Sequence, residues 1–216
     1  MSEINKALSL FDNIINPVDQ EKQKVIDELE LMRDHTDDKF IKQGAWIEKN
    51  FEKAIALYTK AEAKDKADKA ARMLYFTYLD KGERDKARKF LNDSVSKGLA
   101  QGYFYSQLAN FYYEEKNFDE ALKYNLKGLK ADPDEAENYF GAGVNYYYKR
   151  DNKQALKYLE KVVPMYQKNQ SLDYLGDAYA YLYKINIEEG NKEKADEIEA
   201  AAGQELGKEN WEKKKF

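Results

Sequence analysis

The sequence contains one histidine, His35, which stands beside three carboxylates, Asp34, Asp37 and Asp38. An imidazole with nearby carboxylates can bind a metal ion, but a single imidazole on one helix is a weak pattern for a metal site. The same residues serve equally well as a solvated or helix-capping cluster, which is the interpretation we favour. No nucleophile motif accompanies His35, so Ser–His–Asp catalysis is not expected.

Two other fragments resemble parts of ligand-binding motifs. Gly141-Ala142-Gly143 lacks the third glycine and the preceding strand of a phosphate-binding loop. Asp132 and Asp134 lack the remaining ligands of a calcium loop. The chain contains no cysteine, which excludes disulfides, thiolate catalysis and cysteine metal ligands. We therefore predict a protein that is not an enzyme and that holds no metal and no cofactor.

The composition is typical of a folded helical protein. Of the 216 residues, 43% are apolar and 35% are charged, which is too apolar for a disordered chain. The net charge of -4 disfavours non-specific binding to nucleic acid, which needs a basic surface. No stretch approaches the roughly 20 apolar residues of a membrane span, and the first residues lack the basic segment of a signal peptide. We expect a cytoplasmic protein, although removal of a leader peptide would leave the same sequence.

Alanines recur along the chain at a nearly constant spacing, and this spacing indicates the elements that carry any functional surface. Ala54, Ala87, Ala121 and Ala155 are separated by 33, 34 and 34 residues, and Ala195 follows at a longer interval. A period of this length is typical of stacked helical hairpins, each of which cannot bury its apolar face alone. A stack of this kind holds a surface in place more readily than it builds a catalytic centre.

Other columns of residues align with the alanines. The segment 102–135 has Leu108, Ala109 and Tyr112 upstream of Ala121, and a small residue, Gly128, downstream of it. This pattern resembles the tetratricopeptide repeat, a helix-turn-helix unit of about 34 residues with small residues at fixed positions. Small side chains let two helices approach closely, and large aromatic side chains fill the adjoining gaps.

The expected turns agree with this resemblance. Gly82, Asn117 and Gly190 lie where the first helix of a unit must end, and Gly and Asn tolerate the left-handed conformation used there. Asp132-Pro133-Asp134 is expected to end a second helix, because proline disfavours helix in the residue before it.

The resemblance implies an all-α fold, a right-handed α-solenoid of about five TPR-like helical hairpins with extra N-terminal helices. The N-terminal helical cap covers 1–34, and residues 19–49 form either two helices or one long helix, which we slightly favour. The predicted repeat array over 35–207 divides into units 35–67, 68–101, 102–135, 136–169 and 170–207, and a C-terminal tail follows over 208–216.

The last unit departs from the regular spacing. Gly176 is 19 residues from Ala195, whereas Gly143 is 12 residues from Ala155. If Gly176 continues the column of small residues, the extra residues amount to about two helical turns. The first helix of this unit is then expected to run to about Glu189.

The same resemblance implies that a peptide lies in a concave groove lined by the first helix of each hairpin. Tyrosine is enriched at binding hot spots. The alternative is that most of the 18 tyrosines pack between helices, as Tyr78, Tyr112, Tyr146 and Tyr179 are expected to do. The predicted groove residues are Lys39, Trp46, Lys69, Arg72, Phe76, Tyr103, Asn110, Tyr113, Phe140, Val144, Tyr147, Tyr148, Asp173, Asp177 and Tyr181.

We expect a protein–protein interaction scaffold or adaptor that binds a protein segment in this aromatic-lined groove. A clamp for the terminal carboxylate of a chaperone is not expected, because Met73 and Tyr103 stand where the resemblance requires asparagine and lysine. The predicted partner is a protein or a peptide, and neither nucleic acid nor a membrane.

The alternative is a structural or assembly protein that self-associates as a homo-oligomer through the extended last unit. Apolar side chains crowd its extra turns and need a cover. The tail, with Trp211 and Phe216, is one candidate cover, and a partner or a second copy of the chain is the other. The apolar side chains concerned are Tyr181, Leu182, Tyr183, Ile185 and Ile187.

Overall fold

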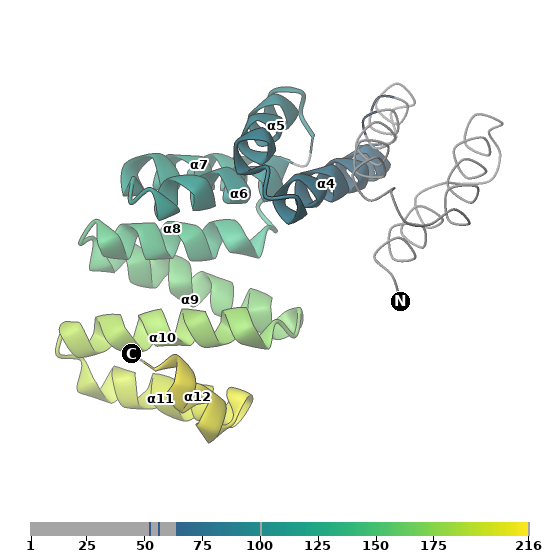
Figure 1. Ribbon diagram of the computed structural model, residues 1–216. Helices are drawn as coiled ribbons and strands as arrows, with labels where there is room; N and C mark the ends of the chain where they lie inside the picture. The colour runs from purple at the N-terminus through teal and green to yellow at the C-terminus, as the bar shows by residue number, and fades with distance from the viewer. Residues whose placement is uncertain (1–51, 53–55, 57–63, 100, 216) are drawn as a thin grey trace, which may run out of the picture. The chain divides into compact units, whose positions relative to one another are not determined.

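The computed structural model describes residues 52, 56, 64–99 and 101–215, and all regular structure within them is helical (Figure 1). None of the helices in these segments is long and apolar enough to cross a membrane. The chain divides into two compact units between Ala100 and Gln101. The expectations for the cap over 1–34, for one or two helices over 19–49, for the His35 cluster and for Lys39 and Trp46 lie outside the described residues.

The described part of the first unit is one helical hairpin, α4 (Lys64–Asp80) followed by α5 (Arg84–Ser96). Leu74 of α4 and Ala87 of α5 are completely buried. Its apolar residues therefore face inward at the helical spacing that the sequence predicts.

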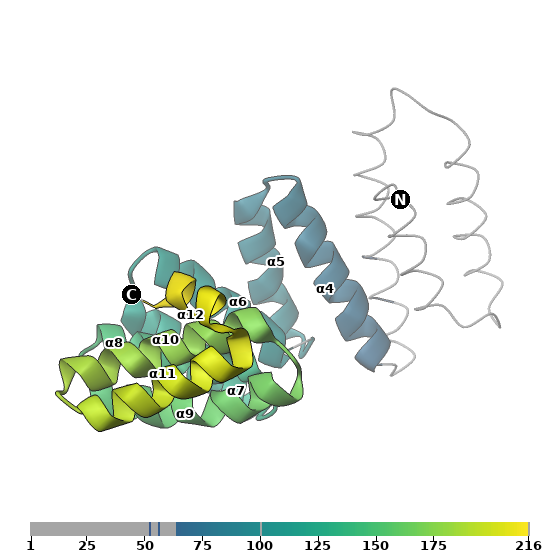
Figure 2. The ribbon, with the colours of Figure 1, turned by 90° about the horizontal axis from the view of Figure 1, so that it is seen from below.

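The second unit is a stack of three helical hairpins closed by a short helix (Figures 1 and 2). Its helices are α6 (Gln101–Glu114), α7 (Phe118–Ala131), α8 (Ala136–Tyr148), α9 (Asn152–Lys168), α10 (Leu172–Glu188), α11 (Lys192–Leu206) and α12 (Lys208–Lys214). The first helices of the hairpins, α6, α8 and α10, contact one another in a row, and α12 packs against α10 and α11. Layers that contact only their neighbours make a solenoid, so the all-α solenoid of helical hairpins predicted from the sequence is confirmed.

The periodic alanines lie where helices approach most closely. Ala87, Ala121, Ala155 and Ala195 are each 0% exposed. Facing Ala155, the first helix of the same hairpin carries Gly143, where an added Cβ would lie 2.7 Å from Leu159 Cγ. The helices α8 and α9 can therefore pack this closely only because Gly143 and Ala155 are small.

A second close contact joins neighbouring hairpins, between α7 and α8. Asn125 of α7 lies against Gly141 of α8, and Asn138 of α8 lies against Gly128 of α7. Both asparagines are buried. The Asn138 side-chain amide also donates a hydrogen bond to the Gly102 carbonyl at 2.8 Å, which ties α8 to the start of α6. The space beside each glycine is therefore filled by the asparagine side chain of the opposite helix.

The turn inside each hairpin has the same geometry in both units. The amide that follows the turn bonds the carbonyl five residues back, at 2.9–3.0 Å, and the residue between adopts a left-handed backbone. Glycine takes the left-handed position in two hairpins, at Gly82 and Gly190, but Lys116 (φ 58°) and Arg150 (φ 63°) take it in the other two. A left-handed backbone places the Cβ of any other residue close to the following carbonyl, so lysine and arginine are strained there.

The prediction that Asn117 adopts the left-handed conformation is wrong. Lys116 adopts it, and Asn117 lies one residue further on as the N-cap of α7. Its side-chain oxygen accepts a hydrogen bond from the Glu120 amide at 3.2 Å. Asn117 therefore caps the second helix of the hairpin, and its short side chain with an acceptor oxygen suits this role.

The turn also fixes the register of the last hairpin. Its turn hydrogen bond is accepted by Asn186, as the equivalent bond is accepted by Tyr146 in the preceding hairpin. Counting back from these residues, Tyr183 and not Gly176 corresponds to Gly143. The prediction that Gly176 continues the column of small residues is therefore wrong.

The extra length between Ala155 and Ala195 is shared between two helices, α9 and α10. As predicted, the long first helix α10 reaches Glu188, and Glu189 caps it. However, α9 has 17 residues against 14 in α7, and α10 has 17 against 13 in α8. Pro164 lies inside α9 without ending it. Both helices that meet in this layer are thus longer than their counterparts.

The helix α12 covers part of the last hairpin. Trp211 is 2% exposed, and its ring meets Tyr183 edge-on with centroids 5.8 Å apart. Lys215 lies over the same Tyr183 ring and pairs with Glu199. The tail therefore covers Tyr183, one of the apolar residues expected to need a cover, while Ile187 stays 47% exposed.

We expect Gly128→Ala to destabilise the second unit by about 1–3 kcal/mol, because the added methyl group overlaps the Asn138 side chain. The free energy of unfolding in urea, followed by circular dichroism, measures this loss. The matched control is Gly203→Ala in α11, where a Cβ meets only Lys208 Cγ at 3.9 Å. This change should stabilise by up to about 1 kcal/mol through helix propensity, so equal effects of the two changes would contradict the packing argument.

Replacing Lys116 with glycine is expected to stabilise the protein by about 0.5–1 kcal/mol, because glycine adopts φ 58° without strain. The same urea titration measures the gain. A loss of stability in Lys116→Gly would show that the lysine side chain contributes more than its backbone strain costs.

Candidate protein-interaction surface

Six rings of the second unit form one connected group, which we term the aromatic face. Successive ring centroids lie 4.7–6.0 Å apart. Phe118 and Tyr148 are stacked with their planes 7° apart, and the other pairs meet at steeper angles. Offset and edge-on contacts of this kind are favourable beyond the area they bury. The aromatic face consists of Tyr113 of α6, Phe118 of α7, Phe140, Tyr147 and Tyr148 of α8, and Tyr181 of α10.

Three hydroxyl groups of the aromatic face are linked in a chain. The Tyr113 hydroxyl donates to the Tyr148 hydroxyl at 3.4 Å, and the hydroxyls of Tyr148 and Tyr181 are 3.5 Å apart. These hydrogen bonds lower the pKa of Tyr148. Burial, followed by the hydrogen bonding of its hydroxyl to Tyr148, raises the pKa of Tyr181, and burial is also the main cause of the raised pKa of Tyr113. Tyr148 accepts the hydrogen bond from Tyr113, and its hydrogen bond with Tyr181 can run in either direction.

Part of the aromatic face is open to solvent. Tyr148 is 42% exposed, whereas Tyr113, Phe140 and Tyr181 are half-buried. Asn110, one turn before Tyr113 on α6, is exposed. These residues of the predicted groove offer ring edges, hydroxyls and an amide to a ligand.

Two predicted groove residues are buried in the structure. Val144 is 4% exposed and Tyr147 is 7% exposed. The Tyr147 hydroxyl donates to Glu188 Oε1 at 2.8 Å, and burial together with this carboxylate raises the pKa of Tyr147 to about 12. Both side chains belong to the core between α8 and α10, so they support the surface without forming it.

In the first unit, three predicted groove residues share one side of α4. Lys69 is exposed, Arg72 is half-buried and Phe76 is 44% exposed. Their spacing of three and four residues places them on one helix face. In the second unit the predicted residue Tyr103 is half-buried, and its ring lies 5.7 Å from that of Phe104.

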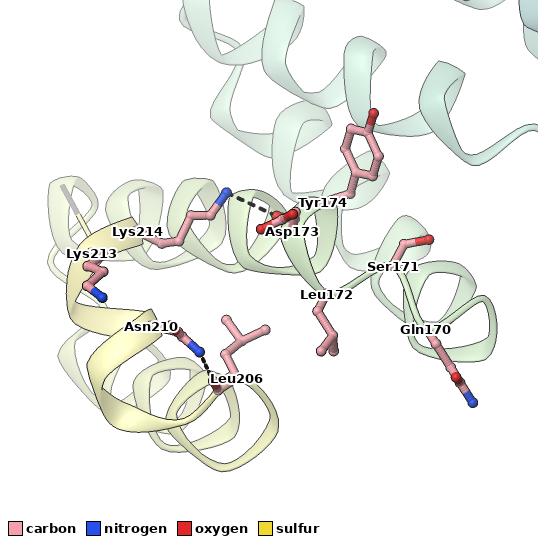
Figure 3. Close-up of a pocket in the computed structure, with 9 residues that line it drawn as sticks. All are labelled: Gln170, Ser171, Leu172, Asp173, Tyr174, Leu206, Asn210, Lys213 and Lys214. Carbon is pink, nitrogen blue, oxygen red and sulfur yellow. Dashed lines mark hydrogen bonds between the residues drawn. The ribbon is translucent and has the colours of Figure 1, made fainter. Parts of the chain in front are cut away.

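Carboxylates gather near the starts of α8 and α10. Glu137 and Asp173 lie in the first turns of these helices, and Asp177 follows one turn later. Asp177 pairs with Lys214 of α12 at 2.7 Å, and Lys214 also donates to the Asp173 carbonyl at 3.2 Å (Figure 3). The turn register places Asp177 level with Glu137. In place of Asp173 and Tyr181, this register assigns the remaining groove positions of α10 to Ala180, Lys184, Ile187 and Glu188.

A cavity of about 660 Å³ opens between the start of α10 and α12 (Figure 3). Leu172 and Tyr174 in its wall are 55% and 50% exposed. A second hollow of about 380 Å³ lies between α9, α10 and α11. The first cavity is lined by Gln170, Ser171, Leu172, Asp173, Tyr174, Leu206, Asn210, Lys213 and Lys214.

Three residues that form or support this surface were not predicted from the sequence. Phe118 is the first residue of α7, outside the groove positions, but its place directly after the turn brings it beside Tyr148. Tyr166 lies in α9 and contacts Phe140. Lys214 belongs to the tail, whose path the repeat pattern does not determine.

The chemistry of this surface suits non-covalent binding. Within the described segments, no group of three or more histidine, aspartate or glutamate side chains could hold a metal ion. The surface offers aromatic rings, hydroxyl groups and carboxylates, which bind apolar and cationic groups of a ligand.

Comparison with a known family agrees with this architecture. Residues 45–98 match the family model described as tetratricopeptide repeat. No curated protein matches the sequence significantly. The tetratricopeptide resemblance inferred from the alanine spacing is thereby confirmed.

Solved structures share the fold. The chain is similar to MamA at 19% identity with a TM-score of 0.54, covering 83% of this chain and 99% of MamA. It is similar to BtubC (BKLC) from P. vanneervenii at 19% identity with a TM-score of 0.57, covering 95% and 91%. The similarity to YrrB, described as a TPR protein with an unusual peptide-binding site, is 20% identity with a TM-score of 0.51, covering 73% and 78%. At these identities the likeness shows the fold alone.

We expect alkaline pH to destabilise the second unit through Tyr147. Its pKa is about 12 in the folded chain against 10.0 in the unfolded chain. Between these values the unfolded chain has released a proton that the folded chain retains, so stability falls as the pH rises. In Tyr147→Phe the free energy of unfolding should fall less between pH 10 and pH 12 than in the wild type, as measured by urea titration.

The control for this experiment is Tyr174→Phe. The Tyr174 side chain is 50% exposed, and its hydroxyl makes no hydrogen bond within the described part of the chain. This variant should keep the wild-type pH dependence. A Tyr147→Phe variant with the same pH dependence as the wild type would contradict the assignment.

Proposed function

We propose that this chain, a tetratricopeptide-repeat protein, is a non-enzymatic interaction scaffold that binds a segment of a partner protein on its aromatic face. The segment is extended or helical, and its apolar side chains contact the exposed rings. Repeats of this fold present such surfaces along their stacked helices, and the aromatic face lies along the row α6, α8 and α10.

The observation that carries the proposal is that the exposed rings are already held in place. The Tyr148 ring is stacked on Phe118 at 4.7 Å, and its hydroxyl accepts a hydrogen bond from Tyr113. A side chain that is fixed before binding loses little conformational entropy when the ligand arrives. A ring that is both fixed and 42% exposed is therefore a good anchor for a partner.

One structural neighbour supports a peptide as the ligand. YrrB is described as a TPR protein with an unusual peptide-binding site. From this neighbour the proposal takes only the kind of ligand, and the position of the site is argued from the rings of this chain.

A second candidate function is self-association through α10. Three large apolar side chains of this helix, Leu172, Tyr174 and Ile187, are 55%, 50% and 47% exposed. A second copy of the chain would cover them. Sedimentation that gives the mass of a monomer at high protein concentration would exclude this candidate.

We expect Tyr148→Ala to weaken binding about tenfold or more, because truncation of an aromatic hot spot costs about 2 kcal/mol. The probe comes from random peptides displayed on phage and selected on the full-length wild-type protein. A recovered peptide is synthesised with a fluorescent label, and its Kd is measured by fluorescence polarisation.

The matched control is Tyr158→Ala in α9. Tyr158 is stacked on Tyr146 at 5.4 Å and lies 6.3 Å from the ring of Tyr139, so this variant also loses ring contacts, but outside the aromatic face. It should bind the peptide as the wild type does, and circular dichroism should show both variants folded. Equal Kd values for Tyr148→Ala and the wild type, or no recovered peptide at all, would overturn the proposed function.

A further inference from the structure

The starts of α8 and α10 bring two carboxylates to equivalent positions in neighbouring layers. Glu137 lies nine residues before Tyr146, and Asp177 lies nine residues before Asn186, the residues that accept the two turn hydrogen bonds. The two helices contact each other. Within the described part of the chain, no lysine or arginine pairs with Glu137.

A buried hydroxyl group belongs to a side chain of α9 that contacts both of these helices. Tyr166 is 1% exposed, and its hydroxyl has no hydrogen-bond partner. Burial raises the pKa of Tyr166, and the charges of Glu137 and Asp177 raise it further. Phe140 and Tyr174, which the Tyr166 ring contacts, each lie three residues from one of these carboxylates, and side chains at this spacing are neighbours on a helix. Buried polar groups without a partner are uncommon in proteins and call for an explanation.

Aromatic rings flank the same hydroxyl. The Tyr166 ring is stacked on Tyr174 with centroids 5.6 Å apart, and it meets Phe140 edge-on at 6.3 Å. Phe140 in turn lies 6.0 Å from Tyr181. The carboxylates and Tyr166 are thus continuous with the aromatic face through Phe140.

One ammonium group of the chain itself, that of Lys214, already lies beside these carboxylates. The Lys214 ammonium donates to Asp177 Oδ1 at 2.7 Å. It also donates to the Asp173 carbonyl at 3.2 Å (Figure 3). One positive charge does not neutralise the carboxylates of Glu137, Asp173 and Asp177 together. The three carboxylates therefore keep a net negative charge. The contact with Lys214 shows that an ammonium group fits beside Asp177.

We propose that this acidic end of the aromatic face binds a lysine or arginine side chain of the partner segment. The inference rests on the proposed function, because the same segment would lie on the aromatic face. Carboxylates attract the cation, the faces of the rings stabilise it, and the Tyr166 hydroxyl supplies one further acceptor. The acidic end comprises Glu137, Asp173 and Asp177 with Phe140, Tyr166 and Tyr174.

The neighbouring cavity favours a cation over an anion. Two lysines line it, but Lys213 pairs with Glu209 at 2.8 Å and Lys214 pairs with Asp177. Asp173 lines the same cavity, and its carboxylate has no cationic partner within the described residues. Space of about 660 Å³ beside an unpaired carboxylate suits the long side chain of lysine or arginine.

The inference is tested with the peptides selected by phage display on the full-length wild-type protein. We expect the recovered peptides to contain lysine or arginine. In one such synthetic peptide the basic residue is replaced by norleucine, and both peptides are measured against the wild type and Glu137→Gln. Each single change should weaken binding about five- to tenfold, and the two together no more than either alone, because both remove one ion pair.

The control variant is Asp196→Asn, an exposed carboxylate on α11. It removes the same charge, and its Kd should stay within about twofold of the wild type at about 0.15 M salt, where distant charges are screened. The norleucine peptide tests the contact on unaltered protein, so it does not depend on how well Glu137→Gln folds.

The two proposals fail in different ways. Recovered peptides without basic residues, or independent effects of the norleucine and Glu137→Gln changes, would overturn the acidic end and leave the aromatic face intact. Loss of peptide recovery altogether would overturn the proposed function as well.

A further variant tests Lys214 as the occupant of the site in the free chain. Lys214→Met frees Asp177 for the partner, so the same peptide should bind about threefold more tightly. An unchanged or weaker affinity would show that Lys214 does not compete for the site.

Discussion

The structure depends on how closely its helices can approach one another. Where two helices of a hairpin meet, the side chain is an alanine that is 0% exposed. Where α7 meets α8, the glycines Gly128 and Gly141 each leave room for an asparagine of the other helix. These contacts leave no space for a large side chain between α7 and α8, whereas the rings of the aromatic face contact one another elsewhere along α6, α8 and α10.

The sequence was sufficient to predict the helical hairpins and the places where they turn, because small residues at a fixed period have few structural explanations. It was insufficient wherever the outcome depended on the exact register. Gly176, like Gly143, lies three residues before a tyrosine. The turn hydrogen bond accepted by Asn186 nevertheless shows that Tyr183 is the residue equivalent to Gly143. The longer interval before Ala195 indicates that residues have been added, but it does not show how they divide between α9 and α10.

Exposure was equally difficult to predict for the candidate site. Tyr147 and Tyr148 are adjacent and chemically identical, yet their exposed fractions are 7% and 42%. Successive residues of a helix point about 100° apart, so one ring turns into the core toward α10 and the next turns out over Phe118. The repeat positions implied by the family resemblance assign both Tyr147 and Tyr148 to the groove. Only the packing of the neighbouring helix α10 shows that one ring is buried and the other exposed. The acidic end required a contact between the tail and α10 that no repeat position encodes.

The placement of α12 limits how copies of this chain could assemble. A further hairpin in the same stack would have to pack on α10 and α11, and α12, with Trp211 buried beneath it, already contacts both helices. Helical repeat arrays end with elements that cover the last layer. Growth of a filament by addition of one chain to the C-terminal end of another would therefore require α12 to detach first. Lateral contacts between copies would leave α12 in place.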